Sequence, residues 1–189
     1  MKGKLLIIIY FVTSFFLTAQ ISDLTYDDSK SVISDSLYGQ FITEMHFGAY
    51  LYKNHFVNAQ ELLDNIKSLC KDKAIFIDFW ATWCSPCIKA MPYNKRMYFE
   101  TKDLPIEFIY CCTSIGSTLD NWITKISVFR QPGIHIFVDS KVNTELMRLL
   151  SVGGYPSYVF IDANGEYKPG AIPVHTSTTV DMLKGLIKK

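Results

Sequence analysis

Two cysteines three positions apart are the residues of this sequence whose types and spacing point most directly to chemistry. Cys84 and Cys87 lie in the stretch WATWCSPCIKAMP, which runs from Trp80 to Pro92. Two thiols at this spacing can supply half of a zinc site, close a structural disulfide, or exchange electrons through a reversible disulfide. The surrounding sequence must decide among these three kinds of site.

A metal site lacks the ligands that it would need. A structural zinc site needs two ligands besides Cys84 and Cys87. None of the other cysteines and histidines shows ligand spacing: Cys70, Cys111, Cys112, His46, His55, His135 and His175. We therefore expect no metal, and a redox use of Cys84 and Cys87 is favoured over a purely structural one.

A strand and a helix are predicted to meet at the first of these cysteines. The short apolar run Ala74–Trp80 predicts a strand buried on both faces, and a helix is expected from about Cys84 to Glu100. Free backbone N–H groups and the dipole at a helix N-terminus favour an anion, which lowers the pKa of a thiol placed there. Cys84 is thus the expected nucleophile and the more exposed thiol. Cys87, one turn later, is the expected resolving thiol.

Strands and helices alternate along the rest of the chain. Strands are expected over residues 106–112, 134–138 and 158–162, the last running into a hairpin turn at 163–165. Helices are expected from the Asn58 cap to about 69, and over 119–129, 143–150 and about 179–187. This order predicts an α/β sandwich without a second domain. The segment 37–51 satisfies both strand and helix spacing, so its type stays open.

The first twenty residues have the layout of a secretory signal peptide. Lys2 and Lys4 precede an almost unbroken apolar run of 13 residues, Leu5–Leu17, and polar sequence follows. The run is short for a membrane span, which needs about 20 residues. Because the cleavage site is imperfect, an uncleaved membrane anchor remains an alternative. Residues 1–20 are assigned to this signal, 21–57 to a partly flexible lead-in, and 58–189 to the folded domain.

Composition and cysteine count narrow the function further. The 189 residues are 49% hydrophobic with a net charge of +1, which is ordinary for one globular domain. A net charge this close to zero shows no excess of basic residues of the kind that binds nucleic acid. The five cysteines are an odd number, so at least one thiol is free or pairs between chains. Adjacent Cys111 and Cys112 would point to opposite faces of a strand, and all three cysteines outside the motif are most simply buried apolar residues.

Two landmarks of the sequence resemble a known family. The segment Asp78–Cys87 (DFWATWCSPC) looks like the active site of thioredoxin-fold proteins, and Tyr155-Pro156 followed by SYVFIDANG resembles their cis-proline loop and hairpin. Together with the export signal, these features are similar to the exported TlpA/ResA-like thiol–disulfide oxidoreductases. The resemblance covers roughly residues 58–188. It implies a thioredoxin-like fold, with a central mixed β-sheet flanked by helices and a helix–strand insert over about 119–138.

The same resemblance implies roles for further residues. Asp78 matches a buried carboxylate that relays a proton to or from the resolving cysteine; a raised pKa would suit that role, whereas a solvated carboxylate is the simpler alternative. Trp83, Tyr155 and Pro156 are implied to contact substrate, with the Tyr155–Pro156 peptide bond cis. No cofactor is expected beyond the redox disulfide Cys84–Cys87 itself.

Three functions are compatible with these residues. The first is an exported, periplasmic oxidoreductase that exchanges disulfides with cysteine-containing exported proteins, as a monomer. By resemblance, the Ser85-Pro86 pair favours a reductase, and the family implies a membrane protein as electron donor. The alternatives are a peptide-binding module with an inert disulfide and a thiol peroxidase. The peroxidase motif Pro-x-x-x-Thr-x-x-Cys is absent, because Ile77 and Ala81 occupy its proline and threonine positions.

Overall fold

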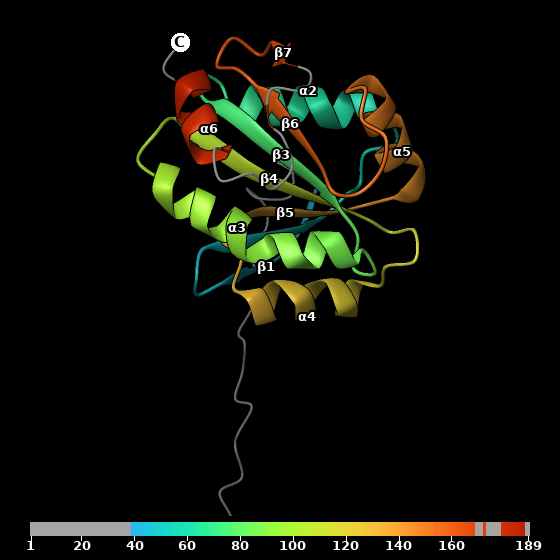
Figure 1. The fold of residues 1–189 in the computed structure, drawn as a ribbon. Coiled ribbons are helices and arrows are strands. Elements are labelled where there is room, and N and C mark those ends of the chain that lie inside the picture. Colours follow the sequence, from blue (N-terminus) through green and yellow to red (C-terminus); the bar gives the residue numbers. More distant parts are fainter. Residues whose placement is uncertain (1–38, 169–171, 173–178, 188–189) are drawn as a thin grey trace, which may run out of the picture.

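The chain forms one mixed β-sheet with helices on both faces (Figure 1). This computed structural model describes residues 39–168, 172 and 179–187, so the predicted signal segment lies outside the described residues. The strands are β1 (Gln40–Met45), β2 (Ala49–Lys53), β3 (Ala74–Trp80), β4 (Ile106–Thr113), β5 (Gly133–Val138), β6 (Ser157–Ile161) and β7 (Tyr167–Lys168). The helices are α2 (Ala59–Leu69), α3 (Ser85–Thr101), α4 (Leu119–Phe129), α5 (Ser140–Leu149) and α6 (Thr179–Ile187).

The seven strands lie in the order β1-β2-β5-β4-β3-β6-β7. Parallel pairing joins β2 to β5, β5 to β4, and β4 to β3. Antiparallel pairing joins β1 to β2, β3 to β6, and β6 to β7. The predicted mixed sheet is therefore present, and β3, which leads into the cysteine motif, lies inside it with strands on both sides.

Side chains alternate between two apolar cores, one on each face of the sheet. All seven residues of β3 are buried. Ile75, Ile77 and Phe79 pack with α2 and α5, whereas Phe76 and Trp80 pack with α3, α4 and α6. Figure 1 shows these two groups of helices on the two sides of the sheet. A strand covered on both faces needs a nearly continuous apolar run, which is why β3 was readable from sequence.

The sheet begins earlier in the chain than expected. Segment 37–51, whose type was open, contributes β1 and β2, which form a hairpin through a turn at Gly48 (φ +80°). β2 then pairs along its whole length with β5, from Ala49 opposite Gly133 to Lys53 opposite Phe137. The boundary that we expected at residue 58 is thus where α2 begins, and the fold already includes residues 40–53 of the supposed lead-in.

Helix boundaries follow their capping residues. Asn58 accepts a hydrogen bond from the Glu61 N–H at 2.8 Å and starts α2, as predicted. Asp139 caps α5, which therefore begins at Ser140, three residues before the expected Asn143.

The predicted insert is present as α4 and β5. Within the described ranges, no helix has the length and apolar character that crossing a membrane requires.

Candidate active site

A disulfide joins Cys84 and Cys87 at the start of α3. Cys84 is the N-cap residue of this helix, and its sulfur accepts a hydrogen bond from the Cys87 N–H at 3.2 Å. This is the helix position at which an unsatisfied N–H can stabilise a thiolate. The first turn of α3 carries no acidic residue, and the two intervening residues are Ser85 and Pro86. Stabilisation of a Cys84 thiolate therefore comes from the backbone rather than from a neighbouring charge.

Exposure does not distinguish the two sulfurs in this oxidised form. Cys84 is 4% exposed and Cys87 is 3% exposed. What differs is the environment: Cys87 lines an internal cavity together with Asp78, and Cys84 is not among the residues that line it. The distinction between a nucleophilic Cys84 and a resolving Cys87 consequently rests on their positions along the helix and on this cavity.

An aromatic wall borders the disulfide on the protein surface. Trp83 is 56% exposed, and its indole N–H donates to the carbonyl oxygen of Ile115 at 2.7 Å. The ring of Tyr155 meets the Trp83 ring edge to face, with 5.9 Å between centroids. The Tyr155 hydroxyl is held from α5 by the side-chain amide of Asn143 at 2.6 Å, and the Tyr155–Pro156 peptide bond is cis. The structure thus brings Trp83 and the cis-proline loop together.

Replacing Gly116 with alanine is expected to displace this wall. Gly116 has φ +64°, and a Cβ built on it would lie 2.9 Å from the indole nitrogen of Trp83. The Trp83–Ile115 hydrogen bond should break, changing the tryptophan fluorescence and lowering the free energy of unfolding. Gly48→Ala is the matched control, since Gly48 also has positive φ (+80°) but no described atom within 4 Å of the added Cβ. Urea unfolding should show Gly116→Ala at least about 1 kcal/mol less stable than the control; equal stabilities and unchanged fluorescence would contradict the steric argument.

Asp78 is a buried carboxyl beneath α3. It is 5% exposed, and its Oδ2 accepts a hydrogen bond from the side-chain amide of Asn94 at 2.8 Å. Burial raises the pKa of Asp78 to about 8, against a smaller lowering by the Asn94 hydrogen bond. The solvated-carboxylate alternative is thereby excluded. A carboxyl whose pKa lies near the working pH can both give and accept a proton.

Asp78 belongs to a polar row that crosses four strands, which sequence reasoning did not find. The register places Tyr158 of β6, Asp78 of β3, Tyr110 of β4 and His135 of β5 side by side. Tyr110 and His135 stack with 4.7 Å between ring centroids, and Tyr158 donates to the Asn94 amide oxygen at 2.7 Å. The sequence did signal each residue of this row, as one polar residue within an apolar strand pattern. Their alignment depends on the order of the strands in the sheet, and a local pattern contains no information on that order.

The remaining cysteines lie in the interior. Cys111 packs in the core beneath α2 and α5, and Cys112 packs in the core beneath α3 and α4, so the expectation of opposite faces is confirmed. Burial raises the pKa of both thiols, for Cys112 to about 12. Cys70 is 2% exposed. None of the three forms a disulfide. They fit the interpretation as buried apolar residues.

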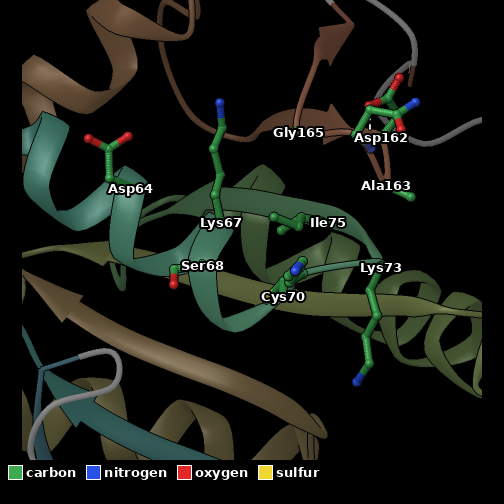
Figure 2. A pocket seen from close by; sticks show the side chains of 11 residues that line it. Asp64, Lys67, Ser68, Cys70, Lys73, Ile75, Asp162, Ala163 and Gly165 are labelled. Atoms are coloured by element: carbon green, nitrogen blue, oxygen red, sulfur yellow. Dashed lines mark hydrogen bonds between the residues drawn. The ribbon is translucent and has the colours of Figure 1, made fainter.

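A larger hollow lies at the other end of β3, far along the strand from the redox pair. It has a volume of about 340 Å³ between the end of α2 and the turn after β6. Figure 2 shows its Lys67 and Lys73 side chains extending in different directions, so their ammonium groups do not converge on one point. Nor do three metal-binding side chains gather anywhere in the described part of the chain. The chemistry that the structure assembles is at Cys84, Cys87 and Asp78.

Comparison with known proteins agrees with this geometry. The family model described as Redoxin matches residues 60–181. The thiol-disulfide oxidoreductase ResA of Bacillus cereus is 31% identical over 122 residues, which are 63% of this chain and 64% of the relative. ResA of Oceanobacillus iheyensis is 30% identical over 118 residues, which are 61% of this chain and 56% of the relative. The matched stretch therefore spans less than two thirds of the length of either relative.

The solved structures show the fold. The thioredoxin domain of a thiol-disulfide oxidoreductase from Bacteroides vulgatus superimposes with a TM-score of 0.56 at 18% identity, covering 64% of this chain and 83% of that one. The thioredoxin-like fold expected from the two sequence landmarks is thereby confirmed.

Proposed function

This chain belongs to the Redoxin family, and on that premise we propose that it is a thiol–disulfide oxidoreductase of the TlpA/ResA-like kind that uses Cys84 and Cys87. The observation that carries the proposal is a disulfide at the N-terminus of α3 whose second sulfur lines a cavity with a buried carboxyl of raised pKa. A structural disulfide would not need such a carboxyl. Disulfide exchange needs a proton acceptor, because the resolving thiol must lose a proton before it can attack.

The proposed reaction moves two electrons from the dithiol to a partner disulfide. The Cys84 thiolate attacks one sulfur of the partner, forming a mixed disulfide and releasing the partner's other thiolate, which takes up a proton. Cys87 then gives its proton to the ionised Asp78 carboxylate and attacks the Cys84 sulfur. This step forms the Cys84–Cys87 disulfide and releases the partner's second sulfur as a thiolate. Proton uptake by that thiolate, from the Asp78 carboxyl or from water, leaves the partner as a dithiol. Trp83, Tyr155 and Pro156 are proposed to hold the extended partner chain beside Cys84, as in strand addition.

We further propose that the reaction runs toward reduction of exported proteins. Strong oxidants of this fold owe their potential to a reduced form with a highly stabilised thiolate. Here the Cys84 sulfur accepts a backbone N–H, and no charged residue lies between the two cysteines. The proposal that the protein works outside the cytoplasm rests on residues 1–20 of the sequence. A donor that restores the dithiol, a membrane protein by the resemblance, is part of the same proposal.

The reduction potential of the Cys84–Cys87 pair tests the direction. Equilibrating the purified protein with dithiothreitol or glutathione buffers should give a value below about −200 mV, nearer to thioredoxin (about −270 mV) than to a strong oxidant (about −120 mV). The reduced protein should also reduce insulin. A potential near −120 mV would contradict the reductase. Peroxide turnover without insulin reduction would support a peroxidase, and neither activity would support an inert binding module.

A further inference from the structure

Four residues that line the cavity between Asp78 and Cys87 each carry a buried polar atom without a described hydrogen-bond partner. The cavity has a volume of about 10 Å³, close to the smallest that holds one water molecule. Its lining residues are Asp78, Trp80, Cys87, Met91, Asn94, Tyr110, Gln131 and His135. Four atoms of these residues are buried without a hydrogen-bond partner among the described residues: Asp78 Oδ1, Trp80 Nε1, Gln131 Oε1 and His135 Nδ1. Buried polar groups are normally paired, so a shared partner is called for.

The hydrogen-bonding capacity of three of these atoms follows from their neighbours. His135 Nε2 lies 3.0 Å from the carbonyl oxygen of Gln131, which can only accept, so Nε2 carries the hydrogen. Burial lowers the pKa of His135 to about 3, which keeps the ring neutral and leaves Nδ1 as an acceptor. The Gln131 side-chain amide donates its N–H to the Tyr110 hydroxyl at 2.7 Å, so its Oε1 is a second acceptor. The Trp80 indole can only donate.

The fourth atom completes the set. Asp78 Oδ2 accepts from Asn94, which places the proton of the neutral carboxyl on Oδ1 and makes that atom a donor. The atoms of the cavity lining that have no described partner are therefore two donors, from Trp80 and Asp78, and two acceptors, from Gln131 and His135. A water molecule offers two hydrogens and two lone pairs, which is the complement of this arrangement.

We propose that Trp80, Gln131 and His135 hold one internal water molecule against the Asp78 carboxyl and act as positioning residues for proton exchange at that carboxyl. The water accepts hydrogen bonds from Trp80 and Asp78 and donates to Gln131 and His135. Ionisation of Asp78 converts one of the two donors into an acceptor. The water then faces three acceptors with two hydrogens, so the set favours the protonated carboxyl.

The other titratable groups that face Asp78 do not provide a competing charge. They are Tyr110 and Cys112 on β4, His135 on β5, Tyr158 on β6 and Cys87 on α3, whose sulfur is held in the disulfide. Cys111 lies on the opposite face of the sheet and interacts with Asp78 only through space. Burial raises the pKa of both tyrosines and of Cys111 and Cys112, so these groups stay uncharged near neutral pH. The hydrogen bonds available in the cavity therefore act on the protonation of Asp78 in addition to burial, which is the main cause of its raised pKa.

Two substitutions should move the pKa of Asp78 in opposite directions. His135→Phe removes an acceptor, frees a water hydrogen for the carboxylate and should lower the Asp78 pKa by about one pH unit. Trp80→Phe removes the fixed donor and should raise it by a similar amount. The measurement is titration of the Asp78 carboxyl carbon by NMR in the oxidised protein. Shifts in the same direction, or no shifts, would overturn the proposal, because a merely structural role predicts no reversal of sign.

The unmodified protein gives a second, independent test. Cross-relaxation between water and the Trp80 indole proton, and electron density in a high-resolution crystal structure, should both place a water within hydrogen-bond distance of the four atoms. A cavity without density, or direct hydrogen bonds among the four atoms, would refute the water site.

The role of these residues in disulfide exchange rests on the proposed function, but neither measurement involves disulfide exchange. A protein that fails to reduce insulin could still hold this water, and the two failures are thus distinguishable.

Discussion

A Cys87→Ser variant is expected to stop exchange after its first step and to accumulate mixed disulfides through Cys84. Cys84 can still attack a partner disulfide from the helix N-terminus, where it accepts the backbone N–H of residue 87. Without a second thiolate in reach, release of the partner becomes slow. Non-reducing electrophoresis after incubation with insulin or with an exported-protein fraction should show covalent adducts that dithiothreitol removes.

The matched control is Cys84→Ser, which keeps one motif thiol but leaves it facing the internal cavity. Its adduct yield should be lower by about tenfold or more, because Cys87 faces the internal cavity and does not hold the N-cap position that stabilises the Cys84 thiolate. Cys70, Cys111 and Cys112 are 2% exposed or less, so adducts through them should be negligible, and a triple-alanine background verifies this. Equal yields from the two serine variants would reverse the assigned roles. No adducts from either variant would favour an inert disulfide.

Replacing Asp78 with asparagine is expected to stabilise the protein and to remove part of its pH dependence. The pKa of Asp78 is about 8 in the folded state, compared with about 3.9 in an unfolded chain. Between these values the folded state holds a proton that the unfolded state has lost, so stability is fully present below the unfolded pKa and falls as pH rises toward 8. At pH 8 or above, the variant should be more stable by several kcal/mol, with about 6 kcal/mol as an upper bound.

The window between pH 6.5 and pH 8 isolates this effect. Burial lowers the pKa of His135 to about 3, so His135 contributes the opposite slope, with stability rising up to about pH 6.5. Above pH 6.5, of these two residues only Asp78 still makes the free energy of unfolding change with pH. Urea unfolding of the oxidised protein should therefore show a loss of about 2 kcal/mol from pH 6.5 to pH 8, absent in Asp78→Asn. Parallel curves for both proteins would mean that Asp78 is already ionised at pH 6.5.

The parts of the fold that were predictable from sequence are those that local patterns determine. The limits of β3 and α4 agree with the predicted ranges, because a doubly buried strand needs an apolar run and a capped amphipathic helix shows its own period. The β1–β2 hairpin was ambiguous, since residues 37–51 fit both periods. Its strand state is decided by pairing with β5, about eighty residues later in the chain. That partner is invisible to a local pattern.

The candidate site divides in the same way. The two cysteines and Asp78 lie in one continuous segment, so their motif could be read directly. Asn94, Gln131 and His135 reach Asp78 or its cavity from α3, from the loop before β5 and from β5 itself. In the sequence, His135 is an isolated histidine within an apolar strand and carries no pattern. Only the register across β3, β4 and β5 gives it a neighbour.

If the chain is exported as we propose, the burial of three cysteines in the two cores has a consequence for its oxidative folding. In an unfolded chain any of the five thiols can pair with another, and an oxidant outside the cytoplasm would not discriminate among them. Once β4 is covered on both faces, Cys111 and Cys112 are 0% exposed and lie in separate cores, and Cys70 is 2% exposed. Burial then keeps oxidants and other thiols away from these three cysteines. Cys84 and Cys87 are left as the pair that forms a disulfide. A core substitution that loosens the cover of β4 would therefore appear first as scrambled disulfides, before any loss of secondary structure.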